Sequence, residues 1–65
     1  MFPERLKDLR KEKGMTQIEL ATALGVSSGT VAMWETGKRK PSFEMFEKLT
    51  QVSDKRIDYI LGTSD

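Results

Sequence analysis

Apolar residues recur at helical spacing through most of the chain. In the first segment Phe2, Leu6 and Leu9 fall at i, i+4 and i+7, which places them on one face of a helix with charged residues around it. Pro3 suits the first turn of such a helix, and Gly14 suits the position just after its end. The pattern predicts an amphipathic first helix between these two residues.

Two short helices joined by a tight turn are predicted next. Thr16 followed three residues later by Glu19 is the pattern of a capping box, which marks the start of a helix. Gly25 suits the left-handed backbone that ends many helices. We expect the following helix to run from a cap at Ser27 to about Thr36. The segment therefore predicts a helix, a turn and a second helix.

A fourth helix is predicted to begin at Pro41-Ser42. Phe43, Phe46 and Leu49 follow at i, i+3 and i+6, and we expect all three to face inward.

A fifth helix is predicted near the end of the chain, carrying Ile57, Ile60 and Leu61 before Gly62. Two interpretations of its start remain open. Ser53 and Asp54 can cap this helix, or residues 53–56 can form a solvated loop.

The predicted helices give one all-α domain over residues 1–65, because no segment alternates apolar and polar residues as a strand does. A domain of 65 residues buries only about 60% of its unfolded surface. The expected core is Phe2, Leu6, Leu9, Leu20, Leu24, Val31, Trp34, Phe46, Leu49 and Ile60.

The chain has no Cys and no His, which removes disulfides, Cys/His zinc sites, thiol nucleophiles and imidazole bases. Acidic residues such as Glu44, Glu47 and Asp58 have no nucleophile–base pair or phosphate-binding glycine loop beside them in the sequence. We expect no enzymatic activity, no cofactor and no metal. No run of about 18 apolar residues and no signal-peptide pattern is present, so we expect a cytoplasmic protein without a membrane partner.

Charge is unevenly distributed along the chain. The formal net charge is +1, but residues 1–43 carry eight basic and five acidic side chains, and residues 44–65 carry three and five. The basic part includes the run Lys38-Arg39-Lys40. Such a run is usually a solvated loop, and it also suits a nucleic-acid backbone.

Four motifs occur in order along nearly the whole chain. They read R-L-K-x-L-R-K-E-K-G (5–14), T-Q-x-E-L-A-x-x-L-G-V-S (16–27), T-V-x-x-W-E-x-G-K-x-x-P-S (30–42) and I-D-Y-I-L-G (57–62). In these motifs the chain resembles the lambda-repressor-like (Cro/CI, Xre) helix-turn-helix proteins. The resemblance implies a compact five-helix domain whose helix-turn-helix spans about 16–36, with its second helix in the major groove of DNA.

Residues opposite Val31 and Trp34 on the third helix are the expected base readers, since the resembled family uses these positions for base edges. They are Ser28, Gly29, Ala32 and Met33. The chain departs from the family here, because none of the four is an Arg, Asn or Gln that can pair with a base by two hydrogen bonds. These four residues offer one hydroxyl, a glycine that permits close approach of the backbone, and apolar groups suited to thymine methyls. Gly29 and Ala32 are also explained as surface residues that make no DNA contact.

Phosphate contacts are expected just outside the third helix. The resemblance implies that Gln17 donates to a phosphate at the start of the second helix, and residues after the third helix would reach the next phosphates. These expected contacts are Thr36, Lys38, Arg39 and Lys40. The resemblance also implies that Arg10 pairs with Glu35 to brace the first helix against the third.

The function implied is sequence-specific binding of double-stranded DNA at a pseudo-palindromic operator, as a phage, prophage or bacterial transcriptional repressor. An antitoxin or a restriction-controller protein would use the same module. A third alternative is a protein-interaction module that has lost DNA binding. We expect a weak homodimer completed on DNA, with Ile57, Tyr59, Ile60 and Leu61 as the apolar groups available for contact, although most of them also suit the core.

Overall fold

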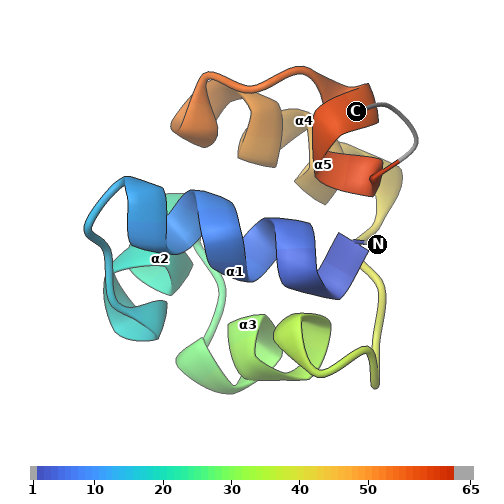
Figure 1. Ribbon diagram of the computed structural model, residues 1–65. Helices are drawn as coiled ribbons and strands as arrows, with labels where there is room; N and C mark the ends of the chain where they lie inside the picture. Colours follow the sequence, from blue (N-terminus) through green and yellow to red (C-terminus); the bar gives the residue numbers. More distant parts are fainter. Residues whose placement is uncertain (1, 63–65) are drawn as a thin grey trace.

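The computed structural model describes residues 2–62, and over this range it contains five α-helices and no strand. The helices are α1 (Phe2–Glu12), α2 (Gln17–Leu24), α3 (Ser28–Glu35), α4 (Phe43–Ser53) and α5 (Ile57–Leu61). In Figure 1, α2 and α3 lie below α1, and α4 and α5 lie above it. The predicted all-α, five-helix architecture is confirmed.

The ends of α2 and α3 follow the capping chemistry predicted for them. The Thr16 hydroxyl accepts from the Glu19 backbone N–H at 3.0 Å, and the Glu19 carboxylate accepts from the Thr16 N–H at 2.8 Å. Gly25 ends α2 with a φ of 77°, in the left-handed region that favours glycine. Ser27 caps α3 through the Thr30 N–H at 3.2 Å. These bonds fix the helix-turn-helix backbone locally.

The core lies where the five helices meet. Its buried apolar residues are Phe2, Leu6, Leu9, Leu20, Ala21, Leu24, Val31, Trp34, Leu49 and Ile60. Phe46, expected among them, is only partly buried and packs edge-on against Phe2 with ring centroids 5.2 Å apart.

Phe43 does not face inward as predicted. Its side chain is 70% exposed. Six residues of an α-helix turn through about 600°, which leaves Phe43 about 120° around α4 from the buried Leu49. The i, i+6 spacing was therefore the wrong criterion for the inward face.

Ser53 and Asp54 do not cap α5. Ser53 is the last residue of α4, where its buried hydroxyl donates to the Leu49 carbonyl at 2.5 Å, and Asp54 follows with a φ of 59°. The residue before α5 is Arg56, which makes no side-chain cap hydrogen bond. Residues 54–56 form the connection between α4 and α5, so the loop interpretation is correct for them but wrong for Ser53, which is helical and 1% exposed.

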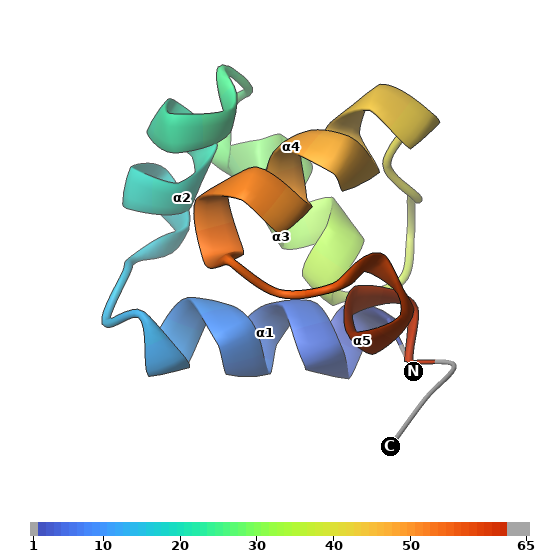
Figure 2. The same cartoon turned by 90° about the horizontal axis from the view of Figure 1, so that it is seen from above.

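α5 lies beside the start of α1 in both views (Figures 1 and 2). The Arg5 guanidinium of α1 lies 4.7 Å from the centre of the Tyr59 ring, and the Lys55 ammonium lies 5.0 Å from it. Lys55 also reaches back to the Glu12 carboxylate at 3.2 Å. Over residues 2–62, the helices are too short and too polar to cross a membrane.

Candidate nucleic-acid interface

α3 presents one face to the core and leaves the other open. Val31 is 0% exposed and Trp34 is 3% exposed, so these residues anchor the helix against α1 and α2. The residues on the opposite side are Ser28 and Gly29, which are exposed, and Ala32 and Met33, which are partly buried. The packing thus directs the four predicted base-reading positions away from the core.

This open face offers little hydrogen-bonding capacity, since the Ser28 hydroxyl is its one polar side-chain group. Gly29 is not needed for the backbone conformation, because its φ lies outside the left-handed region. A Cβ added at Gly29 would meet only the Ser27 hydroxyl oxygen, at 3.8 Å. The absence of a side chain at this position is therefore not explained by folding.

A buried ion pair joins the helices behind this face. Arg10 Nε lies 2.6 Å from Glu35 Oε2, and Arg10 Nη2 donates to Glu35 Oε1 at 3.2 Å. The remaining guanidinium nitrogen, Nη1, donates to the Met15 carbonyl in the turn between α1 and α2. The Glu35 side chain is 1% exposed and that of Arg10 is 13% exposed. The pairing predicted for these two residues is present, and it ties the end of α3 to α1.

Gln17 takes part in the same network, which the sequence did not predict. Its side-chain Nε2 donates to Glu35 Oε1 at 3.2 Å. The two residues are 18 positions apart, and only the packing of α2 on α3 brings them together. As a result, the amide at the start of α2 lies at the end of α3.

The cationic segment Lys38-Arg39-Lys40 follows α3 and is exposed. Gly37 turns the chain with a φ of 80°, and the backbone N–H of Lys38 then donates to the Met33 carbonyl at 3.0 Å. Among residues 2–62 these three cations make no ion pair. They are therefore available to an anion near the end of α3.

Two of the predicted phosphate contacts are also engaged within the protein. The Thr36 hydroxyl donates to the Ala32 carbonyl at 3.1 Å and to the Met33 carbonyl at 3.2 Å. Thr36 would have to rotate its hydroxyl to donate to a phosphate. Gln17 keeps a second amide hydrogen besides the one given to Glu35.

Arg39 and Lys40 border an apolar groove of about 350 Å³ at the start of α1. Its other lining residues are Phe2, Pro3, Gly37, Phe46 and Leu61.

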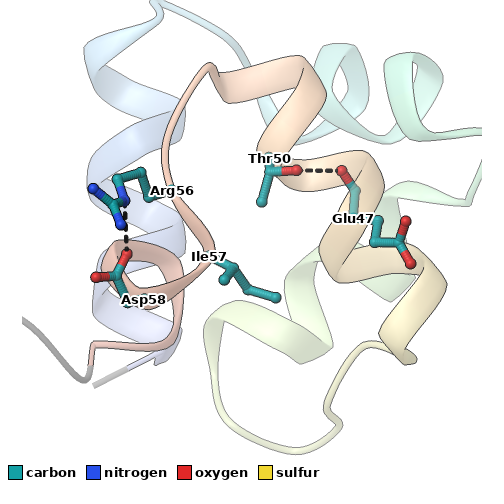
Figure 3. Close-up of a pocket in the computed structure, with 5 residues that line it drawn as sticks. All are labelled: Glu47, Thr50, Arg56, Ile57 and Asp58. Atoms are coloured by element: carbon teal, nitrogen blue, oxygen red, sulfur yellow. Dashed lines mark hydrogen bonds and ion pairs between the residues drawn. The ribbon is translucent and has the colours of Figure 1, made fainter.

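A second surface feature lies between α4 and α5. An open groove of about 610 Å³ is lined by Glu47, Thr50, Arg56, Ile57 and Asp58 (Figure 3). Ile57 projects from the start of α5 into this space, beside the 3.7 Å pair of Arg56 and Asp58. Phe43 precedes Glu47 by four residues and Thr50 by seven, so it lies on the same face of α4.

The apolar residues predicted for contact between copies differ in their exposure. Ile57 is 37% exposed and Leu61 is 38% exposed, whereas Ile60 is fully buried. Tyr59 is partly buried against the core. Ile60 is therefore a core residue, and the exposed Phe43 takes its place in the apolar surface of this end.

Comparisons with known proteins give a consistent result. A family model described as helix-turn-helix matches residues 6–60. The chain is 34% identical over 61 residues to the HTH-type transcriptional regulator YqaE of Bacillus subtilis, covering 94% of this chain and 53% of that protein. It is 37% identical over 65 residues to RstR, the cryptic phage CTXphi transcriptional repressor of Vibrio cholerae, covering 100% of this chain and 59% of that protein.

A solved structure gives the same match in three dimensions. The crystal structure of a transcriptional regulator from Listeria innocua superposes with a TM-score of 0.91 at 32% identity, covering 100% of this chain and 61% of that chain. The chain thus spans between 53% and 61% of the length of these three proteins.

Proposed function

The chain belongs to the helix-turn-helix family, and on this premise we propose that it binds double-stranded DNA and regulates transcription, with α3 in the major groove. One observation carries the proposal. The inward face of α3 is fully packed, while its outward face is exposed at Ser28 and Gly29 and only partly buried at Ala32 and Met33. Three cations follow it that make no ion pair among residues 2–62. A surface helix that ends beside basic residues suits a groove walled by phosphates.

Phosphate contacts are assigned around the end of α3. Gln17 supplies an amide donor beside the first-turn N–H groups of α2, which favour an anion. Lys38, Arg39 and Lys40 supply charge, and Thr36 supplies a hydroxyl. These contacts set register and most of the affinity, because they do not depend on base sequence.

Base contacts are assigned to the outward residues of α3. Ser28 provides a single hydrogen bond, Met33 and Ala32 provide apolar contact with thymine methyls, and Gly29 permits close approach of the backbone. Without a bidentate reader, each base pair contributes modestly, and DNA shape adds to specificity.

Two copies are proposed to act on one pseudo-palindromic operator. One copy extends 28 × 23 × 20 Å, whereas half-sites lie about 34–36 Å apart, so a single copy does not reach both. The groove between α4 and α5, with Phe43 and Ile57 exposed beside it, is the proposed contact between copies. Its apolar area is small, which favours a weak dimer completed on DNA.

The proposed role is repression, the role that the name of the relative RstR carries. Selection from random duplexes is expected to return two half-sites. A reporter placed behind the selected site should be expressed less when the chain is present. Higher expression would contradict repression, and no binding to any duplex at low salt would favour a protein-interaction module instead.

The phosphate assignment is tested by salt dependence. Lys38→Ala should reduce the slope of log affinity against log salt by about 1, because one fewer counterion is released. Lys48→Ala on α4 is the matched control, since Lys48 is also exposed but lies outside the proposed DNA contacts. An unchanged slope for Lys38→Ala would contradict the phosphate assignment.

A further inference from the structure

We propose that Glu35 is a positioning residue for DNA binding, which orients the side-chain amide of Gln17 so that one of its hydrogens is presented to a phosphate. This inference rests on the proposed function. The Arg10–Glu35 pair alone would only brace two helices, and the contact from Gln17 to the same carboxylate adds the further role.

The hydrogen bonds of Glu35 leave one orientation for the Gln17 amide. Glu35 Oε2 accepts from Arg10 Nε at 2.6 Å, while Oε1 accepts from Arg10 Nη2 and from Gln17 Nε2, both at 3.2 Å. An ionised carboxylate only accepts hydrogen bonds, so it pairs with the nitrogen of the amide and repels the oxygen. The buried carboxylate therefore selects which end of the amide faces it.

This orientation determines what Gln17 offers to a ligand. An amide nitrogen carries two hydrogens, and Glu35 takes one of them. The other remains at the start of α2, beside backbone N–H groups that have no partner inside the helix. A reversed amide would place its oxygen, an acceptor, where a phosphate oxygen would come.

The buried position of the Glu35 carboxylate prevents it from repelling the phosphates of DNA. The Glu35 side chain is 1% exposed, so a phosphate does not contact it directly. Arg10 compensates its negative charge across 2.6 Å. The carboxylate can thus hold a donor at the DNA surface without itself repelling the backbone.

The orientation can be measured in the unaltered chain by NMR of the Gln17 side-chain amide. In the free protein, one of the two amide protons should exchange slowly with water, because it is bonded to Glu35. On addition of an operator duplex, the second proton should shift while the first keeps its protection. Equal exchange of both protons in the free protein, or loss of the protected one on binding, would overturn the proposal.

A double-mutant cycle tests the consequence for affinity. E35Q should weaken operator binding about fivefold more when Gln17 is present than in a Q17A background, the factor equivalent to about one neutral hydrogen bond. E35Q also leaves the charge of Arg10 uncompensated, but this effect is the same in both backgrounds and cancels.

The controls separate this inference from the proposed function. The exposed Gln51 of α4 gives a matched background, and E35Q should have the same effect with or without Q51A. An equal effect of E35Q with and without Gln17 would overturn the positioning role while DNA binding itself stood. Absence of operator binding by the unaltered chain would defeat the proposed function. If E35Q does not fold, the NMR measurement decides alone.

Discussion

The two sides of α1 differ in the polar contacts that hold them. On one side, α2 and α3 supply half of the buried apolar core and also make directional polar contacts: the capping box of Thr16 sets the start of α2, and the buried pair of Arg10 and Glu35 joins α1 to α3. On the other side, α4 and α5 supply Leu49 and Ile60 to the core, the ion pair of Lys55 with Glu12 that joins this side to α1 is more exposed, and α5 begins without a side-chain cap.

The difference matches what each side is proposed to do. A hydrogen bond constrains both distance and direction, so the α2–α3 side keeps its surface groups in a defined arrangement, as recognition of a DNA groove requires. On the other side, the apolar side chains of Phe43 and Ile57 are exposed, and this is the surface proposed to contact a second copy.

The largest effect is expected from breaking the buried ion pair. Arg10→Ala should lower the free energy of unfolding by about 3 kcal/mol or more, because it leaves the Glu35 carboxylate buried without a compensating charge. The free energy of unfolding of a small domain is only about 0.05–0.15 kcal/mol per residue, so this loss is a large share of the total. Urea unfolding followed by circular dichroism measures the loss.

The control uses an ion pair with different exposure. Glu12→Ala removes the pair with Lys55 and leaves the contact of Lys55 with the Tyr59 ring in place; because the Glu12 side chain is 56% exposed, the change should cost less than about 1 kcal/mol. Similar losses for the two variants would remove the contrast between buried and surface pairs on which the comparison rests.

A smaller effect is expected at the helix caps. Thr16→Ala should destabilise the domain by about 1 kcal/mol, because it removes the capping box of α2.

Arg56→Ser should stabilise the domain by about 0.5 kcal/mol, because α5 has no side-chain cap to lose and serine supplies one. Thermal unfolding of both variants tests this, and destabilisation by Arg56→Ser would mean that its exposed pair with Asp58 outweighs a cap.

The sequence predicted the helix boundaries of the α2–α3 side better than those of the α4–α5 side. On the α2–α3 side, helix boundaries depend on local chemistry, and Thr16, Gly25 and Ser27 were correctly predicted to begin or end helices. On the other side no local signal was decisive. Phe43 has the same apolar character whether it faces the core or solvent, and Ser53 and Asp54 are cap residues by type that serve the end of α4 instead.

The candidate site was predictable in part for the same reason. Helical periodicity separates the buried Val31 and Trp34 from the outward face of α3, so the outward positions follow from spacing alone. The contact of Gln17 with Glu35 does not follow from spacing, because it depends on the angle at which α2 packs on α3.

A change of about 0.5 kcal/mol is expected at Gly29, in the stabilising direction. Gly29→Ala reduces the conformational entropy of the unfolded chain, and the added methyl group has space in the folded one. The same variant should weaken operator binding if the backbone approaches DNA closely at this position. Unfolding and gel-shift titrations measure the two effects separately, and tighter binding with higher stability would place Gly29 outside the DNA contact.

The smallest effect on stability is expected at Phe43, whose loss should act between copies. Phe43→Ser should change the free energy of unfolding by less than about 0.5 kcal/mol, because the ring is 70% exposed and contributes little to the core. Burying the ring against a second copy would stabilise a dimer by about 1–2 kcal/mol, so the variant should raise the concentration needed for two copies to occupy one operator by about tenfold.

Ile18→Ser is the matched control, since Ile18 is 67% exposed but lies on α2, away from the groove of Ile57. Sedimentation with a duplex of two half-sites measures the occupancy. Equal occupancy by Phe43→Ser and the unaltered chain would place the contact between copies elsewhere, and a stable dimer at low micromolar concentration without DNA would contradict completion of the pair on the operator.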